Sequence, residues 1–461
     1  VPIKKGHKKG NKLIVIDTRE VELTRYADLW LRPFPGTESS LIGGMLKVIF
    51  DEDLQDADFL GNKPENLEEL KTSLSSYDLD SVERTTGVAA DKIAIAARYF
   101  ASANSAAVVY ALDNIAVENR ESLTYSTINL ALVTGNVGNP NAGLFPLRPG
   151  ANSQGALDVG CNPAYLPVQV AVDKPGLTAP AALESMVAGN VKAAMVIGDS
   201  PLFTVEAIHA LTHTKFLVVQ DLFLNDLAQC ADVVLPMTSF AEDDGTVTNL
   251  DRWVQLRRMA IEAPGEARSS TYTFAELSKR MGTTDLGDGD PTTILSEIAN
   301  LVPAYAAINR KVLEDGDFQL PWSLPESVSL SGFAPLQRRE GGELEFLFAP
   351  GRVLAMPGEE IEIIHSNGKN AIRREDALEV HPDDAVSLGI VPGDVIEIAT
   401  PTHRIRGMAR TTGTLRGVVA ATVLFGELAI ALDQSDDYDP MLRVPGLHVM
   451  PVRVEKIASK Q

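Results

Sequence analysis

The chain has 461 residues and a formal net charge of -21, from 41 Lys and Arg against 62 Asp and Glu. This length allows two to four domains, and the acidic charge argues against nucleic acid and anionic lipid as partners, because both require clustered lysines and arginines. No apolar stretch reaches the ~18 residues of a membrane span, and no apolar signal region opens the chain. We therefore expect a cytoplasmic protein without direct membrane insertion, which could also lie on the cytoplasmic side of a membrane complex.

The first part of the chain alternates short apolar runs with helical spacing. Residues 1–12 resemble the end of a helix that stops at Gly10. We therefore expect a further segment upstream, which is either missing from this sequence or supplied by another chain. A short β-branched strand then ends at Asp17. Further on we predict helices near residues 40–50 and 90–103, a buried strand at 106–111, and a helix over 127–135 that ends at Gly135.

The pattern restarts after a Gly- and Pro-rich passage around 135–155. We predict strands at 195–199, 216–221 and 231–236 with helices between them, which is typical of parallel doubly wound sheets. Ligands of such sheets bind beyond the carboxyl ends of the strands, where Asp17, Asp199 and Asp221 stand.

From residue 346 onward short strands and close turns indicate a small β-barrel. The fold class is therefore α/β: two Rossmann-like domains and a C-terminal small barrel cap. The predicted boundaries are 1–147 for the first α/β domain with its opening strands missing, 148–300 for the second, 301–345 for a linker and 346–461 for the barrel.

The two cysteines, Cys161 and Cys230, are too few for a four-thiolate cluster or a Cys-rich zinc site. With no disulfide framework, a reducing compartment is favoured. His209 and His213 stand four residues apart and could share a helix face. Because no third ligand is near, we expect a polar helix end rather than a metal site, and we predict no metal ligand in this chain.

The run Ile16-Asp17-Thr18-Arg19 has the layout of a nucleotide-binding strand end. Asp17 can accept hydrogen bonds from a ribose or a guanine edge, and Arg19 can clamp a phosphate bidentately. The structural alternative is an Asp that caps the next helix and an Arg in a surface ion pair.

Four separated segments together resemble the molybdopterin oxidoreductase family, in particular formate dehydrogenase large subunits. They read KLIVIDTREVELTRYADLWLRPFPGTES, NLALVTGNVGNPNAGLFPLRPGANSQGALDVG, the 53 residues from FLVVQDLFLNDLAQCADVVLP to APGEAR, and LEVHPDDAVSLGIVPGDVIEI. In the first segment Thr18 replaces a usual Pro and Glu38 a usual Asp.

The resemblance implies two dinucleotide-binding α/β domains and a molybdopterin-dinucleotide-binding barrel. It also implies that the family's N-terminal iron–sulfur domain and metal ligand are not in this sequence. Arg148 matches an arginine near the metal that orients the substrate carboxylate, which would make it catalytic only if the chain is active. The resemblance assigns cofactor contacts to Asp17, Arg19, Gly36, Thr37, Asn152, Gln154, Gly155, Gly198, Asp199, Pro201, Gln220, Asp221, Asp244, Gly245, Thr246, Asn249, Gly351 and Arg352. The alternative is that these residues serve the fold, as Gly at turns and Asp at helix caps.

Three stretches depart from the catalytic pattern: ALDNIAVEN at 111–119, GRVLAMPGEE at 351–360 and VLFGELAIALDQS at 423–435. Each lost polar contact to a buried cofactor costs about 1–3 kcal/mol. The body of the large iron–sulfur subunit of respiratory complex I resembles formate dehydrogenase yet has no catalytic molybdenum centre.

The main hypothesis is therefore a structural, metal-free body of an electron-transferring complex I-like NADH dehydrogenase or electron-bifurcating complex, with no cofactor in this chain. Its partners would be iron–sulfur and flavin- or NAD-binding subunits. The alternative is the catalytic body of a formate dehydrogenase with bis-molybdopterin guanine dinucleotide and Mo or W, whose cluster and metal-ligand segment is elsewhere. A stand-alone nucleotide- or pterin-binding protein is a third hypothesis.

Overall fold

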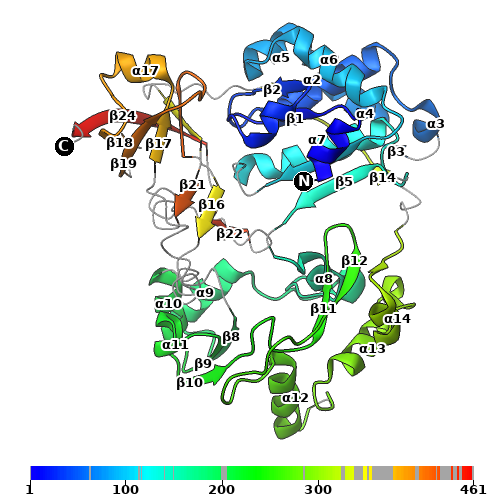
Figure 1. Ribbon diagram of the computed structural model, residues 1–461, viewed down its shortest axis with the longest axis vertical. Helices are drawn as coiled ribbons and strands as arrows, with labels where there is room; N and C mark the ends of the chain where they lie inside the picture. Colours follow the sequence, from blue (N-terminus) through cyan, green and yellow to red (C-terminus); the bar gives the residue numbers. More distant parts are fainter. Residues whose placement is uncertain are drawn as a thin grey trace.

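The computed structural model describes residues 2–61, 64–112, 115, 117–139, 141–148, 150–198, 205–283, 286–322, 328–336, 346–349, 352–355, 377–399, 404–421, 423–425, 438–439, 444–445 and 449–458. Figure 1 shows the first α/β region above the second, with the barrel beside the first. Among the described residues, no helix is both long enough and apolar enough to cross a bilayer.

The first region holds helices around short parallel strand pairs. Its elements are α1 (Pro2–Lys8), β1 (Ile14–Ile16), η1 (Glu22–Tyr26), β2 (Leu29–Leu31), α2 (Glu38–Asp51), α3 (Ala57–Leu60), β3 (Pro64–Glu65), α4 (Leu67–Ser73), η2 (Leu74–Ser76), α5 (Leu79–Thr86), α6 (Ala90–Ala101), β4 (Ala107–Ala111), α7 (Val117–Val133) and β5 (Gly143–Leu147). β1 pairs with β2, and β4 with β5, both in parallel. The core forms chiefly where α2 packs against α5, α6 and α7.

Two predictions in this region are corrected. The helix predicted at 127–135 begins ten residues earlier, at Val117, and ends at Val133. Its buried face carries Arg120, Ser126, Thr127 and Asn129, which hide the apolar periodicity. The strand predicted as buried at 106–111 is β4, where Val109 is 45% exposed, because in the described residues β4 pairs with β5 alone.

The second region combines a parallel sheet with an antiparallel one. Its elements are α8 (Ser153–Asp158), β6 (Tyr165–Leu166), η3 (Pro167–Gln169), β7 (Val170–Ala171), α9 (Ala179–Val187), β8 (Ala193–Ile197), α10 (Val205–Thr212), β9 (Phe216–Asp221), α11 (Asp226–Gln229), β10 (Val233–Pro236), β11 (Gly245–Thr248), β12 (Trp253–Arg257), α12 (Ser270–Met281), α13 (Pro291–Leu301), η4 (Pro303–Tyr305), α14 (Arg310–Asp315), β13 (Phe318–Gln319) and β14 (Val328–Ser329). The parallel order is β10-β9-β8, which confirms the three predicted strands with ends shifted by up to two residues. The antiparallel β11-β12-β13 sheet has no counterpart in the predicted elements.

The described residues of the predicted linker, 301–345, are packed rather than loose. Asn309 caps α14, and Val302, Tyr305, Ile308, Leu313 and Leu320 form a core with Val254. Residues 328–336 return to the first region, where β14 pairs with β3 and the amide of Asn129 exchanges two hydrogen bonds with the backbone of Ser331. Short contacts with two different cores explain the weak periodicity of this segment. The predicted domain boundaries themselves stay a prediction.

The third region contains the predicted barrel, which closes in the order β15-β20-β17-β19-β18-β24. Its elements are β15 (Phe346–Ala349), β16 (Arg352–Ala355), β17 (Ala377–Val380), α17 (Pro382–Ser387), β18 (Val395–Ala399), β19 (Arg404–Thr411), β20 (Val418–Ala420), β21 (Val423–Phe425), β22 (Tyr438–Asp439), β23 (Val444–Pro445) and β24 (Met450–Ala458). Alternating residues such as Ile396, Ile398, Val452 and Val454 fill its interior. The mixed α/β class with parallel sheets and a C-terminal barrel is therefore confirmed.

Candidate functional site

The end of β1 brings the first group of candidate residues together. The Oδ1 of Asp17 accepts from the backbone N–H of Arg19 at 2.9 Å, and the Nε of Arg19 lies 3.5 Å from the same oxygen. Both side chains are largely buried, with 22% and 12% exposed. Asp17 and Arg19 thus form a local turn and an ion pair. Asp17 does not cap the next helix, since η1 follows Val21 without a side-chain cap, and Arg19 is largely buried rather than at the surface. Both residues lie where a nucleotide would bind in the other interpretation.

The loop before α2 lies beside this strand end. Gly36 has φ 83°, so the backbone favours glycine there, and an added Cβ would lie 2.9 Å from the Nδ2 of Asn119 and displace that amide. The buried Thr37 donates from Oγ1 to the carbonyl oxygen of Phe34 at 2.7 Å. Its hydroxyl is therefore used within the loop.

Glu38 begins α2 at this loop, and its Oε1 accepts from the N–H of Gly36 at 3.3 Å. Desolvation raises the pKa of Glu38 to about 7, and the nearby charge of Asp17 adds to the rise, whereas hydrogen bonds from the N–H groups of Glu38 and Gly36 oppose it. With Glu in place of the usual Asp, a carboxyl group with a pKa of about 7 therefore lies at the end of β1.

A second group lies at the ends of β8 and β9. Gly198, at φ 73°, donates from its N–H to the carbonyl oxygen of Gln220 at 2.8 Å. Asp221 accepts from the N–H of Leu222 at 2.6 Å and from the Nδ2 of Asn225 at 2.9 Å. This carboxylate thus organises the turn that leads into α11.

Gln220 is fully buried, and its amide is only half used among the described residues. The Nε2 donates to the Oγ1 of Thr273 at 3.0 Å, but the Oε1 has no hydrogen-bond partner within that part of the chain. A buried acceptor without a donor is costly, so this oxygen is a candidate contact for a donor from a ligand.

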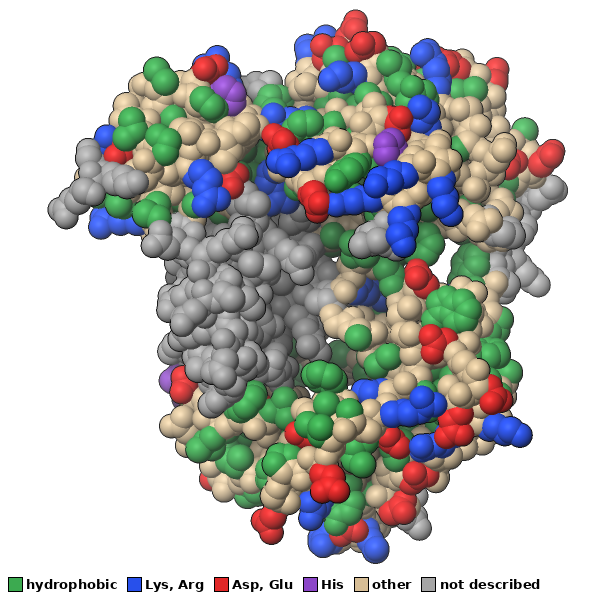
Figure 2. Space-filling model, in the orientation of Figure 1, with side chains coloured by type: hydrophobic (Ala, Val, Ile, Leu, Met, Phe, Trp, Pro, Cys, Tyr) green, Lys and Arg blue, Asp and Glu red, His purple; other side chains and the backbone are tan. Residues whose placement is uncertain are grey.

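Arg148 directly follows β5, where the chain passes from the first region to the second (Figure 1). Its Nη1 is buried and has no hydrogen-bond partner among the described residues. Burial raises the pKa of the neighbouring Tyr110, and the positive charge of Arg148 opposes that rise. A guanidinium whose Nη1 is buried and has no partner in the described part of the chain is suited to an anionic ligand. The space-filling view is hollowed between the two regions (Figure 2).

The signature residues after Arg148 are committed to contacts within the protein. The Oδ1 of Asn152 accepts from the N–H of Thr248 at 2.8 Å, and the Nε2 of Gln154 donates to Asp158 at 2.9 Å. A Cβ at Gly155 would collide with Asn152 and lie 3.2 Å from the Oγ1 of Thr248. Asn152 and Gly155 therefore attach α8 to β11, whereas Gln154 is bonded within α8.

The hairpin of β11 and β12 uses its candidate residues in the same way. Asp244 accepts from the N–H of Met259 at 2.8 Å and from the Nη2 of Arg310 at 3.3 Å. A Cβ at Gly245 would lie 2.9 Å from the Nη2 of Arg257, and Thr246 pairs with Leu256 in the ladder. Asn249 closes the hairpin by accepting from the N–H of Trp253 at 2.9 Å.

Sequence reasoning missed Asp158, Thr248, Tyr305 and Arg310, which complete these two groups. The hydroxyl of Tyr305 hydrogen-bonds to both Asp158 and Thr248. Asp158 and Thr248 stand inside quoted motifs, so their place in the sequence was a usable signal. Tyr305 and Arg310 fall in the segment taken for a linker, where no local signal marks them.

Some candidate residues fall outside this comparison. Asp199, Pro201 and Gly351 lie outside the described residues, and Arg352 is described only as the first residue of β16. Within the described chain no three His, Cys, Asp or Glu side chains come close enough to hold a metal ion. His209 lies in the last turn of α10 and His213 directly follows that helix, with ring centroids 4.4 Å apart. Cys161 and Cys230 are free and exposed.

Two family models match the sequence. The molybdopterin oxidoreductase model covers residues 2–280, and the molydopterin dinucleotide binding domain model covers residues 347–451. The chain belongs to the molybdopterin oxidoreductase family. Its family resemblance is thereby confirmed over both α/β regions and the barrel.

The chain is similar to several α subunits of oxidoreductases, among them formate dehydrogenases. It is 32% identical to "F420-dependent formate dehydrogenase 2 subunit alpha" of Methanococcus maripaludis, over 99% of this chain and 73% of that protein. It is 29% identical to "NADPH-Fe(3+) oxidoreductase subunit alpha" of Geobacter sulfurreducens, over 89% of this chain and 49% of that protein. Acetylene hydratase from Pelobacter acetylenicus shares the fold, with a TM-score of 0.73, 21% identity, and coverage of 99% of this chain and 75% of that one.

These similarities change the balance between the hypotheses. They support the formate dehydrogenase alternative better than the metal-free, complex I-like body that we favoured from the departures in three stretches. The departures at 351–360 and 423–435 lie almost wholly outside the described residues, or in strands whose side chains are not described, so the structure does not test them.

Proposed function

We propose that this chain is the cofactor-binding body of a formate dehydrogenase-type α subunit, and that it acts within a multi-subunit oxidoreductase complex. The observation that carries the proposal is the 32% identity to a formate dehydrogenase α subunit along 99% of the chain. That relative and the NADPH-Fe(3+) oxidoreductase are both named as α subunits, which supports an assembly of several chains.

Molybdopterin guanine dinucleotide with Mo or W is the cofactor that this proposal requires, and the described residues fit such a group in part. Among the described residues, the Nη1 of Arg148 and the Oε1 of Gln220 are buried polar atoms without a hydrogen-bond partner, which a ligand could satisfy. In contrast, Asn152, Gln154 and Asp244 are already hydrogen-bonded within the protein. We therefore expect Arg148 and Gln220 to contact the ligand directly and the other three to shape the site.

The proposed roles follow from side-chain chemistry. Arg148 would orient a carboxylate, because a planar guanidinium pairs with it through two parallel hydrogen bonds. Asp17, Arg19 and Asp221 stand at strand ends, where they would hold nucleotide portions of the cofactor. When bound, the cofactor supplies the two-electron redox chemistry.

The remaining electron carriers are proposed to lie outside this chain. Because the sequence holds only Cys161 and Cys230, we propose that iron–sulfur ligands and the metal's protein ligand come from a neighbouring segment or subunit. We also propose flavin- or NAD-binding partner subunits and a cytoplasmic location.

The metal-free body remains the competing hypothesis, in either a complex I-like or an electron-bifurcating assembly. The observation that favours it is the number of signature residues whose hydrogen bonds are satisfied within the protein, at Asn152, Gln154 and Asn249. On this hypothesis these residues keep the fold without any cofactor.

Metal analysis of the purified complex separates the two. We expect about one Mo or W per chain, a fluorescent oxidised pterin after acid extraction, and formate-dependent reduction of a viologen dye. Absence of metal and pterin from a complex with intact partner subunits would contradict the proposal and favour the metal-free body.

A further inference from the structure

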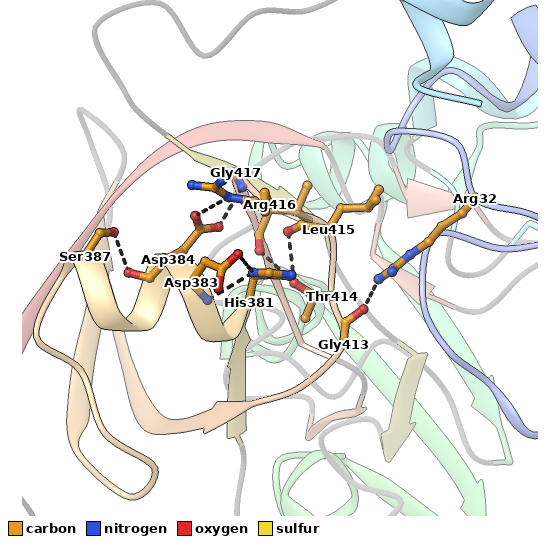
Figure 3. A network of polar contacts seen from close by, with 11 residues as sticks. Arg32, His381, Asp383, Asp384, Ser387, Gly413, Thr414, Leu415, Arg416 and Gly417 are labelled. Atoms are coloured by element: carbon orange, nitrogen blue, oxygen red, sulfur yellow. Dashed lines mark hydrogen bonds and ion pairs between the residues drawn. The ribbon is translucent and has the colours of Figure 1, made fainter. Parts of the chain in front are cut away.

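Arg32, which directly follows β2, bridges the first α/β region and the barrel. Its Nε donates to the carbonyl oxygen of Thr18 at 2.9 Å. Its Nη2 donates to the carbonyl oxygen of Gly413, in the turn between β19 and β20 (Figure 3). One guanidinium therefore touches both the loop after β1 and a barrel loop 381 residues away.

The loop at residues 17–19 is fixed by the neighbouring strand. The Nε1 of Trp30 donates to the carbonyl oxygen of Asp17 at 2.9 Å, and the N–H of Asp17 donates to that of Leu31 at 3.2 Å. The guanidinium of Arg32 lies 5.1 Å from the Trp30 ring centroid, within cation–π range. Of these contacts, that of Arg32 is the one that continues into the barrel.

An apolar contact holds the same two parts together. Phe34, two residues after Arg32, packs with Leu415 against Ala349, Val418 and Ala420 of the barrel. This contact has no direction, whereas the hydrogen bonds of Arg32 require a fixed position of Gly413 relative to Thr18. The side chain of Glu20 also lies beside Gly413, 3.8 Å from the position of a Cβ there.

We propose that Arg32 is a positioning residue that couples the conformation of loop 17–19 to the position of the barrel against the first α/β region. Since that loop is a proposed nucleotide contact, this inference rests on the proposed function for its ligand, though the coupling can be measured without one. Coupling is reciprocal, so a ligand that orders loop 17–19 also stabilises the contact between the barrel and the first α/β region.

Hydrogen–deuterium exchange of the full chain tests the coupling directly. We expect Arg32→Met to raise the exchange rate about tenfold in peptides spanning 12–22 and 410–420 together, because two charge-assisted hydrogen bonds are lost. Arg32→Lys keeps the charge and loses the fork, so an intermediate increase is expected.

Two matched variants serve as controls. Gly413→Ala keeps the acceptor carbonyl, and its added Cβ meets only ordinary contact distances. The exposed Arg404 pairs with Glu397, another residue of the barrel, and does not contact the first region through that pair. Gly413→Ala and Arg404→Met should therefore leave residues 12–22 unchanged. If Arg32→Met loosened only one of the two peptides, or neither, while the melting curve stayed cooperative, the coupling would be wrong.

GDP as a probe separates this inference from the proposed function. In the wild type, GDP should slow exchange at 12–22 and also at 410–420; in Arg32→Met, saturating GDP should protect 12–22 alone. A merely structural role of Arg32 would leave the protection pattern unchanged and would contradict the proposal. If GDP protected neither peptide in the wild type, the nucleotide role of loop 17–19 would fail, and the ligand-free exchange of Arg32→Met would still decide the coupling.

Discussion

Tyr305 donates a hydrogen bond from its Oη to the Oδ2 of Asp158 at 3.0 Å, and the same hydroxyl lies 2.7 Å from the Oγ1 of Thr248. Asp158 is the last residue of α8, the helix that follows Arg148 and Asn152. Tyr305 lies 147 residues later, in a segment predicted to be a linker. Burial raises the pKa of Tyr305, and the charge of Asp158 adds to the rise, so the phenol stays protonated and able to donate.

Tyr305→Phe should destabilise the protein by about 1–3 kcal/mol, because it leaves the partly buried Oδ2 of Asp158 without this donor and the buried hydroxyl of Thr248 without this acceptor. Urea unfolding followed by circular dichroism measures the loss. Tyr272, which is 42% exposed, offers the matched control: Tyr272→Phe should change stability little. Equal stability of the two variants would show that the Tyr305 hydroxyl contributes nothing to the attachment of α8.

Gly155→Ala should be destabilising by about 1–3 kcal/mol through overpacking, since the added Cβ collides with Asn152, which holds β11. Differential scanning calorimetry provides the measurement. Gly332→Ala is the control, because its Cβ would meet Ser73 at 3.5 Å, an ordinary contact distance. A Gly155→Ala variant as stable as Gly332→Ala would mean that α8 and β11 are not in the close contact described.

Glu38→Gln should make stability less dependent on pH. The pKa of Glu38 is raised from 4.5 to about 7, so its contribution is fully present below pH 4.5 and is lost as pH rises through about 7. Glutamine resembles the protonated acid and does not ionise. Relative to wild type, Glu38→Gln should therefore gain about 1–2 kcal/mol between pH 5 and pH 8, a figure reduced for the partial exposure of the side chain.

Chemical denaturation at pH 5 and pH 8 measures that gain. Glu52→Gln is a suitable comparison, because its exposed carboxylate pairs with Arg98, which lowers rather than raises its pKa. The stability of Glu52→Gln relative to wild type should not increase from pH 5 to pH 8. A constant difference for Glu38→Gln at both pH values would show that Glu38 is ionised throughout.

The sequence was sufficient for features with a local signal. Short β-branched runs ending in Asp predicted β1 and β9, and close turns between short strands predicted the barrel. Helix α7 was only half recognised, because Arg120 and Asn129 place polar groups on its buried face. The β11-β12-β13 sheet was missed because its third strand has two residues and pairs across the chain with Trp253 and Val254.

The candidate site was predictable as a set of positions and much less as a set of roles. Motif spacing marked Asn152 and Asp244, but whether their oxygens are spare depends on Thr248 and Arg310, which are distant in sequence. No spacing rule reveals that the Nη1 of Arg148 has no partner among the described residues, because that depends on every neighbour in three dimensions.

Replacing Arg148 is expected to have opposite effects on the stability of the ligand-free protein and on the activity of the complex. In protein free of ligand, Arg148→Met should leave thermal stability unchanged or slightly higher, because it removes a buried N–H without a partner among the described residues. In the assembled complex, the same variant should lower formate-dependent dye reduction by about tenfold to hundredfold, with Arg148→Lys also impaired, because a carboxylate needs the planar fork. Arg404→Met, on the outside of the barrel, should affect neither measurement. A marked loss of stability in Arg148→Met would reveal a structural partner for the guanidinium, and full activity in either Arg148 variant would remove its proposed role in orienting the substrate.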